Sequence, residues 1–163
     1  MYRVAALDPK LGRGGFSCGN DALDRYFKER VTQDIRRRIT NCFVALDEHG
    51  HVAGFYTLAA TGVLLMDLPQ DIIGKLPRYP SVPAIRMGRL AVDLTARGRG
   101  LGGALLADAL TRSMDSEIAA FALVVDAKDD NAVAFYKHHG FILLANHPRT
   151  LFLPLATAQA GTR

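Results

Sequence analysis

The sequence has few of the residues that hold metals and none of the long apolar runs that cross membranes. Its two cysteines, Cys18 and Cys42, lack metal-ligand spacing with each other and with the five histidines. We interpret both as free thiols that are buried or partly buried, and we expect no metal site. No apolar run approaches the roughly 20 residues of a membrane helix, and the first residues lack the layout of a signal peptide. We therefore expect a single domain over residues 1–163, cytoplasmic and without membrane contact.

The sequence also lacks a strong overall charge. The net charge is +4 at pH 7, and the whole excess lies in residues 1–40, which hold nine Lys or Arg against five Asp or Glu. Such an asymmetry indicates either a patch that meets an acidic partner or a solvated basic helix face. Charge alone leaves both interpretations open.

The apolar pattern predicts an α/β protein with a mixed central β-sheet, flanking helices and one βαβ core. Residues 20–38 carry apolar side chains every four residues, as an amphipathic helix does. Residues 67–83, with four prolines, predict a loop with at most a short helical turn. Residues 155–163 predict a flexible tail. The remaining expected elements are a hairpin over 41–65, strands over 84–93, 120–127, 141–145 and 149–155, and helices over 100–117 and 130–140.

The segment "RGRGLGGALL" (97–106) follows the expected central strand and opens a helix. Its glycines have no Cβ atoms that would block the approach of a ligand to the helix N-terminus. The unpaired N–H groups and the arginines there favour an anion. It contains a G-x-G-x-x-G match, but the acid that a dinucleotide site requires would be Glu117, inside the helix. The G-x-x-x-x-G-K-[ST] motif is absent. We predict an anion site, with a simple helix-entry turn as the alternative.

The stretch "RLAVDLTARGRGLGGALLADAL" resembles the coenzyme-binding segment of the GNAT acetyltransferase family, through R-x-x-G-x-G at Arg97, Gly100 and Gly102. In that family the turn wraps the pyrophosphate of acetyl-CoA. The preceding strand is splayed from its neighbour, and a backbone N–H near Val92 would polarise the acetyl carbonyl. The resemblance implies a GNAT fold with a splayed central strand pair. The implied coenzyme-binding residues are Leu90, Ala91, Val92, Arg97, Gly98, Arg99, Gly100, Leu101, Gly102, Asn131 and Phe135.

A second stretch, "DNAVAFYKHHGF", resembles the family's N-x-x-A-x-x-F-Y-x-x-x-G-F signature. The resemblance makes Tyr136 the catalytic general acid. A phenol with an ordinary pKa near 10 stays protonated at neutral pH and can give its proton to a departing thiolate. No strong general base is apparent, and we interpret His138 and His139 as surface residues at a helix end. An α-amino group, with a pKa of about 7.7–8.0, needs less help than a lysine amine.

Nearly the whole chain resembles the acetyltransferase toxins of type II toxin–antitoxin systems. The resemblance implies acetylation of the α-amino group of aminoacyl-tRNA, inhibition of translation, and neutralisation by a ribbon-helix-helix antitoxin. It also implies a homodimer that meets DNA only through the antitoxin. Basic residues near the helix then become candidates for tRNA phosphate contacts or for an acidic antitoxin tail. These candidates are Arg25, Lys28, Arg30, Arg36, Arg37, Arg38, Arg78, Arg86 and Arg89.

Two other functions remain open on the sequence. The chain could be a GNAT acetyltransferase that acts on a small-molecule amine or on a protein N-terminus, although the basic first quarter does not suit a cationic substrate. It could also be a coenzyme-binding module without catalysis, against which the intact Tyr136 and glycine turn argue.

Overall fold

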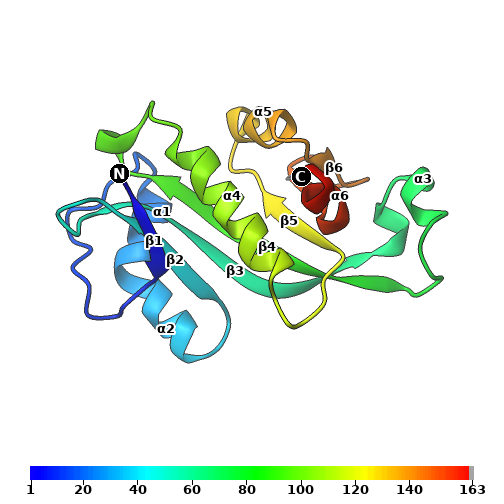
Figure 1. The fold of residues 1–163 in the computed structure, drawn as a ribbon, viewed down its shortest axis with the longest axis horizontal. Helices are drawn as coiled ribbons and strands as arrows, with labels where there is room; N and C mark the ends of the chain where they lie inside the picture. Colours follow the sequence, from blue (N-terminus) through cyan, green and yellow to red (C-terminus); the bar gives the residue numbers. More distant parts are fainter. Residues whose placement is uncertain (162–163) are drawn as a thin grey trace. The chain divides into compact units, whose positions relative to one another are not determined.

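The chain forms a mixed α/β structure in which seven strands join one sheet in the order β1-β2-β3-β4-β5-β7-β6. The computed structural model describes residues 1–161. The strands are β1 (Arg3–Ala6), β2 (Asn41–Leu46), β3 (Val52–Leu64), β4 (Ser81–Val92), β5 (Ala122–Asp126), β6 (Ile142–Leu143) and β7 (Thr150–Pro154). The helices are α1 (Asp21–Arg25), α2 (Val31–Arg36), α3 (Gln70–Ile73), α4 (Leu101–Met114), α5 (Asp130–His138) and α6 (Leu155–Gly161) (Figure 1).

The chain divides into two compact units that alternate along the sequence. The first unit contains residues 1–59 and 88–109, and the second contains residues 60–87 and 110–163. Each unit has a hydrophobic core of its own. The organisation of all 163 residues as one domain therefore stays a prediction.

In the first unit, residues 21–36 form a helix that is interrupted by a π turn at Tyr26–Arg30. Asn20 caps its start through a hydrogen bond from the Leu23 N–H, 3.1 Å long. Side chains spaced by four residues drift by about 40° per step on an ideal α-helix. A wider π turn absorbs part of that drift, which explains how one apolar face persists over four turns.

The core of the first unit lies between this helix and the β2–β3 hairpin. Phe27 stacks on Phe55 with ring centroids 4.3 Å apart, and Phe16 meets both rings edge-on. The hairpin is antiparallel, and β1 pairs antiparallel with β2. Aromatic pairs of this kind add about 0.5–1.5 kcal/mol beyond their burial. The hairpin and helix predictions are therefore confirmed, whereas β1 was missed because its apolar run is only a few residues long.

Helix α4 packs closely on β3 at Gly54. A Cβ at this position would lie 2.8 Å from Leu105 Cδ1 and 2.9 Å from the Ala91 carbonyl oxygen. The Tyr56 phenol of β3 also donates a short hydrogen bond to the Asp108 carboxylate of α4. The absence of a side chain at Gly54 thus sets the distance between the strand and the helix.

We expect Gly54→Ala to lower the free energy of unfolding by about 1–3 kcal/mol, because the new methyl group must displace a backbone carbonyl as well as Leu105. Gly14→Ala is the matched control, since a Cβ there meets nothing within 4 Å. Urea denaturation of both variants measures the difference. Equal stability of the two variants would contradict the close approach.

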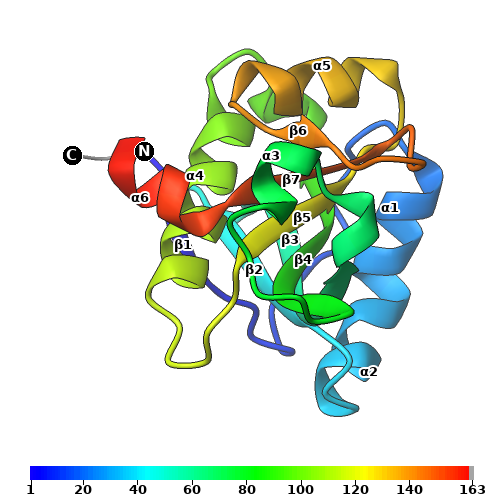
Figure 2. The same cartoon turned by 90° about the vertical axis from the view of Figure 1, so that its right-hand side faces the viewer.

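In the second unit, β5 pairs parallel with β4 and antiparallel with β7, which also pairs antiparallel with β6 (Figure 2). Residues 122–125 of β5 are fully buried, as an inner strand requires. The ladder between β4 and β5 covers Ala84–Met87 and Ala122–Val125, and β4 continues past it to Val92. The parallel pair therefore ends before β4 does, in agreement with the splayed strands of the predicted fold.

Two predicted boundaries are wrong. Strand β4 begins at Ser81, so the end of the expected loop over 67–83 belongs to a strand, whereas the short helix α3 is the helical turn expected there. Residues 155–161 form helix α6 instead of a flexible tail, because Leu155 is buried and bonds through its N–H to the Phe121 carbonyl, at 2.9 Å. The rest of the expected tail, residues 162–163, lies outside the described residues. Over the described part of the chain, the helices are too short or too polar to span a membrane.

Candidate functional site

The glycine-rich segment forms a turn between β4 and α4 in the first unit. Asp93 organises its start by accepting hydrogen bonds from the N–H groups of Ser17 (2.9 Å) and Thr95 (3.0 Å) and from the Thr95 hydroxyl (2.5 Å). Burial raises the pKa of Asp93, but these hydrogen bonds outweigh burial and hold it below its usual value. A charged Asp93 therefore anchors the segment that leads into the turn.

Gly98 and Gly100 give the turn its shape. Their φ angles are +77° and +75°, in the left-handed region that favours glycine. A Cβ at either position would meet nothing within 4 Å, so the space above the turn is open. The first intrahelical bond of α4 runs from the Ala104 N–H to the Gly100 carbonyl at 3.1 Å. The earlier N–H groups of the helix have no acceptor within it, which suits a diphosphate group.

The two arginines of the turn have other contacts. The Arg97 guanidinium donates through Nη2 to the Cys18 carbonyl at 2.5 Å and so braces the loop before α1. Arg99 Nη1 lies 3.5 Å from the Tyr2 hydroxyl. An anion at the turn would therefore be held mainly by backbone amides and the helix dipole.

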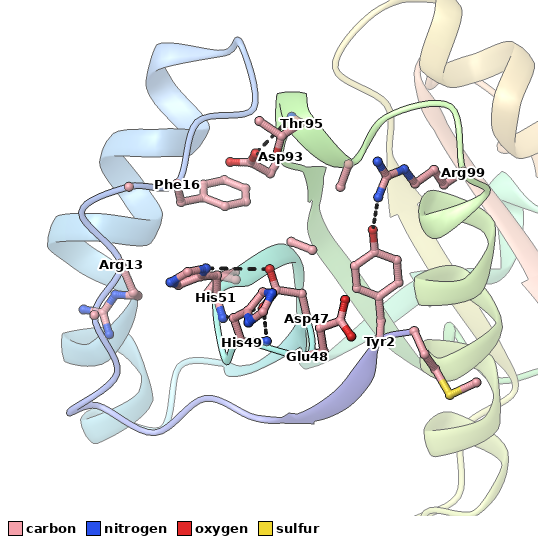
Figure 3. Close-up of a pocket in the computed structure, with 16 residues that line it drawn as sticks. Tyr2, Arg13, Phe16, Asp47, Glu48, His49, His51, Asp93, Thr95 and Arg99 are labelled. Carbon is pink, nitrogen blue, oxygen red and sulfur yellow. Dashed lines mark hydrogen bonds and ion pairs between the residues drawn. The ribbon is translucent and has the colours of Figure 1, made fainter.

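A cavity of about 480 Å³ lies in the same unit (Figure 3). Asp93 and Thr95 lie on one side, and Tyr2 points its hydroxyl at Arg99 on another. His49 and His51 come from the β2–β3 turn, where Asp47 accepts hydrogen bonds from both backbone N–H groups at 2.9 Å. Within the described chain, no three His, Cys, Asp or Glu side chains are grouped closely enough to hold a metal ion. The cavity is a mixed polar and aromatic hollow next to the turn segment.

Tyr136 lies on α5, in the second unit. Asp129 caps this helix by accepting a hydrogen bond from the Ala132 N–H at 2.8 Å. The Tyr136 side chain is 5% exposed and contacts Phe141, with ring centroids 5.6 Å apart. Burial raises the pKa of its phenol above the ordinary value, and the charge of Asp126 raises it further. The phenol is therefore a proton donor at neutral and mildly alkaline pH.

The neighbouring predicted residues of α5 differ in exposure. Asn131 is exposed, whereas Phe135 is half-buried and packs edge-on against His139, with centroids 4.7 Å apart. In the first unit, Ala91 is buried and Leu90 and Val92 are half-buried. The coenzyme roles predicted for these residues stay predictions.

The basic candidates fall into two groups. Arg25, Lys28 and the three arginines at 36–38 are exposed, as is Arg78. Arg86 instead forms an ion pair with Asp126, whose other oxygen accepts from the Thr150 hydroxyl at 3.1 Å. Arg89 lies over the Tyr26 ring, with its guanidinium carbon 3.4 Å from the centroid. Sequence reasoning missed these two contacts, because nothing in the local pattern brings the partners together.

The chain is similar in sequence to a known protein family and to a characterised relative. The model of the "Acetyltransferase (GNAT) family" matches residues 13–141. A "tRNA-acetylating toxin" of Mycobacterium tuberculosis (strain ATCC 25618 / H37Rv) is 37% identical over 147 residues, covering 89% of this chain and 87% of the relative.

Two solved structures have the same fold. AtaT complexed with acetyl-methionyl-tRNAfMet matches with a TM-score of 0.92 and 26% identity over 100% of both chains. AtaTR bound with AcCoA matches with a TM-score of 0.86 and 26% identity, over 99% of this chain and 98% of that one. Family model, relative and structures agree on one fold and one class of chemistry. The chain belongs to the GNAT acetyltransferase family.

Proposed function

We propose that this chain is an acetyl-CoA-dependent N-acetyltransferase toxin that acetylates the α-amino group of aminoacyl-tRNA and so blocks translation. The observation that carries the proposal is its likeness, over 89% of its length, to a tRNA-acetylating toxin. The neighbour complexed with acetyl-methionyl-tRNA supports the same acceptor, and the neighbour bound with AcCoA supports the same donor.

The turn before α4 fits the coenzyme. Its positive-φ glycines leave the cradle open, and the first N–H groups of α4 suit the pyrophosphate. Acetyl-CoA, when bound, supplies the acetyl group as an activated thioester. In this proposal the backbone of Leu90, Ala91 and Val92 orients the acyl arm, and a backbone N–H near Val92 polarises the carbonyl. Asn131 and Phe135 of α5 complete the proposed coenzyme contacts.

Tyr136 acts as the general acid in this proposal. Its buried phenol keeps its proton because its pKa is raised, and Oη–H gives that proton to the departing sulfur. The attacking α-amine needs no strong base, since its ordinary pKa of about 7.7–8.0 is lowered further by the adjacent ester. Much of the amine is already neutral at physiological pH. After attack its nitrogen loses one proton to solvent, and a proton from solvent restores the Tyr136 phenol, so the step balances.

The exposed basic residues of the first unit supply the proposed RNA contact. They are Arg25, Lys28, Arg30, Arg36, Arg37 and Arg38. Lys and Arg contacts to phosphate make affinity fall steeply with salt. Arg86 is a weaker candidate, because its guanidinium already neutralises Asp126. Arg78, in the second unit, is exposed and stays a candidate.

The remaining assignments follow the family resemblance. We propose a cytoplasmic toxin that forms a homodimer and is neutralised by a ribbon-helix-helix antitoxin, through which it meets DNA indirectly. Part of the basic surface would then serve an acidic antitoxin segment in place of tRNA.

The proposed function is tested by incubating the protein with labelled acetyl-CoA and total aminoacyl-tRNA. We expect label in the RNA fraction and, after ester hydrolysis, N-acetyl amino acids in the mass spectrum. Folded protein that binds acetyl-CoA yet transfers no label to any charged tRNA would overturn the proposal.

A further inference from the structure

A second cavity, of about 310 Å³, lies where the π turn faces β4 in the first unit. Its lining consists of Ala22, Leu23, Arg25, Tyr26, Arg30 and Arg89, so half of the lining residues are arginines and none is acidic. Its volume lies at the lower end of the range for small-ligand sites. The cavity therefore suits one small anionic group.

The π turn brings two of these arginines to the same cavity. On a regular α-helix, residues five apart point about 140° away from each other. Here the Val31 N–H donates to the Tyr26 carbonyl, which closes an i→i+5 turn and places residues five apart nearly above one another. Arg25 and Arg30 accordingly line one cavity, and both are exposed. The π turn thus brings together the charges of Arg25 and Arg30, which a regular helix would separate.

Arg89 supplies a planar group to the same cavity. Its guanidinium lies 3.4 Å from the centroid of the buried Tyr26 ring. The Tyr26 hydroxyl donates to the Asp34 carboxylate at 2.7 Å, which fixes the ring. One face of the guanidinium is covered by the ring, and Arg89 also lines the cavity.

A further arginine, Arg13, adds positive charge to the core of the first unit. Arg13 lies over Phe27, with its guanidinium carbon 5.7 Å from the ring centroid, and its Nε and Nη1 are buried without a hydrogen-bond partner among the described residues. Burial raises the pKa of the Cys42 thiol, and the positive charges of Arg13 and Arg89 oppose that rise. The cavity is thus an electropositive hollow with a planar floor.

We propose that this cavity holds one unstacked nucleotide of a single-stranded RNA end, with its base on the Arg89 guanidinium and its phosphate between Arg25 and Arg30. Splayed bases stack on aromatic or guanidinium planes, whereas carboxylates of an acidic peptide need no planar floor. The inference rests on the proposed function, since the single-stranded 3′ end of a charged tRNA carries the acetyl acceptor. It adds a specific subsite to the general basic surface.

The test is fluorescence anisotropy with a labelled, uncharged single-stranded RNA that ends in CCA. We expect Arg25→Ala and Arg30→Ala to weaken binding about tenfold each and to reduce the salt slope by about one. Arg89→Lys keeps the charge and removes the plane, so we expect about a 5- to 100-fold loss with an unchanged salt slope. Lys10→Ala, an exposed charge elsewhere in the first unit, is the matched control and should bind like the wild type.

Wild-type affinity in Arg89→Lys would overturn the stacking platform, and wild-type affinity in both alanine variants would overturn the phosphate clamp. If the variants lost affinity for a glutamate-rich peptide but bound RNA like the wild type, the cavity would belong to a protein partner. That result would overturn the proposal. Acetylation of charged tRNA by the wild type separates the two failures. If the wild type acetylates charged tRNA but the variants bind RNA normally, only the subsite is disproved. If the wild type transfers no acetyl group to charged tRNA, the proposed function is disproved.

Discussion

Tyr136→Phe is expected to lower kcat for acetyl transfer to aminoacyl-tRNA by about 100-fold or more, because positioned proton donors contribute roughly 10²–10⁴-fold. The change removes one oxygen from a ring that is 5% exposed, so the packing against Phe141 is kept. Initial rates with labelled acetyl-CoA and charged tRNA measure the loss. We expect the KM for acetyl-CoA to change little, since the donor contacts of the glycine turn are untouched.

Tyr79→Phe is the matched control for the loss of a phenol. Tyr79 is 64% exposed and should be replaceable without effect on the rate. If Tyr136→Phe retained activity within about threefold of the wild type, Tyr136 would not be the proton donor, and water would have to protonate the leaving sulfur.

The pH profile of the wild type provides an independent check on Tyr136. A general acid must be protonated, and the pKa of this phenol is raised first by burial and then by the charge of Asp126. We therefore expect kcat to rise as the acceptor amine loses its proton and then to stay level up to about pH 10. Rates are corrected for hydrolysis of the aminoacyl ester. A fall below pH 9 that disappears in Tyr136→Phe would contradict the raised pKa.

Gly100→Ala is expected to raise the KM for acetyl-CoA by tenfold or more. The φ angle of +75° strains alanine by about 1 kcal/mol. The new methyl group also projects into the open space of the turn, where we place the pyrophosphate. Both effects displace the amides that would hold the anion. Coenzyme titration by isothermal calorimetry and steady-state kinetics measure the change.

Gly50→Ala separates strain from ligand contact. Gly50, in the β2–β3 turn, has a φ of +78°, and a Cβ there would meet nothing within 4 Å, so its alanine variant carries the same backbone strain. We expect both variants to lose similar stability, while Gly50→Ala keeps the wild-type KM for acetyl-CoA. Equal coenzyme affinity in the two variants would exclude the turn as the pyrophosphate site.

The local motifs were predictable because their partners are close in sequence. The turn at 97–102 needs glycine where φ is positive, and Gly98 and Gly100 supply it directly before α4. The Asn20 cap and the apolar face of the helix over 21–36 follow from residues within a few positions. Such signals survive in one sequence because backbone geometry and capping depend on neighbours along the chain.

By itself, the sequence determined the class of sheet, the glycine turn, the helix that carries Tyr136 and the location of the basic excess. Only the tertiary structure decided which arginines have partners within the protein. It pairs Arg86 with Asp126 and places Arg89 on Tyr26, and a π turn brings Arg25 and Arg30 to one cavity. The first two contacts join elements far apart in the chain, and the π turn departs from the regular helical period, so no local periodicity encodes them. Packing therefore separates arginines that neutralise the protein's own carboxylates from those that remain for an anionic partner.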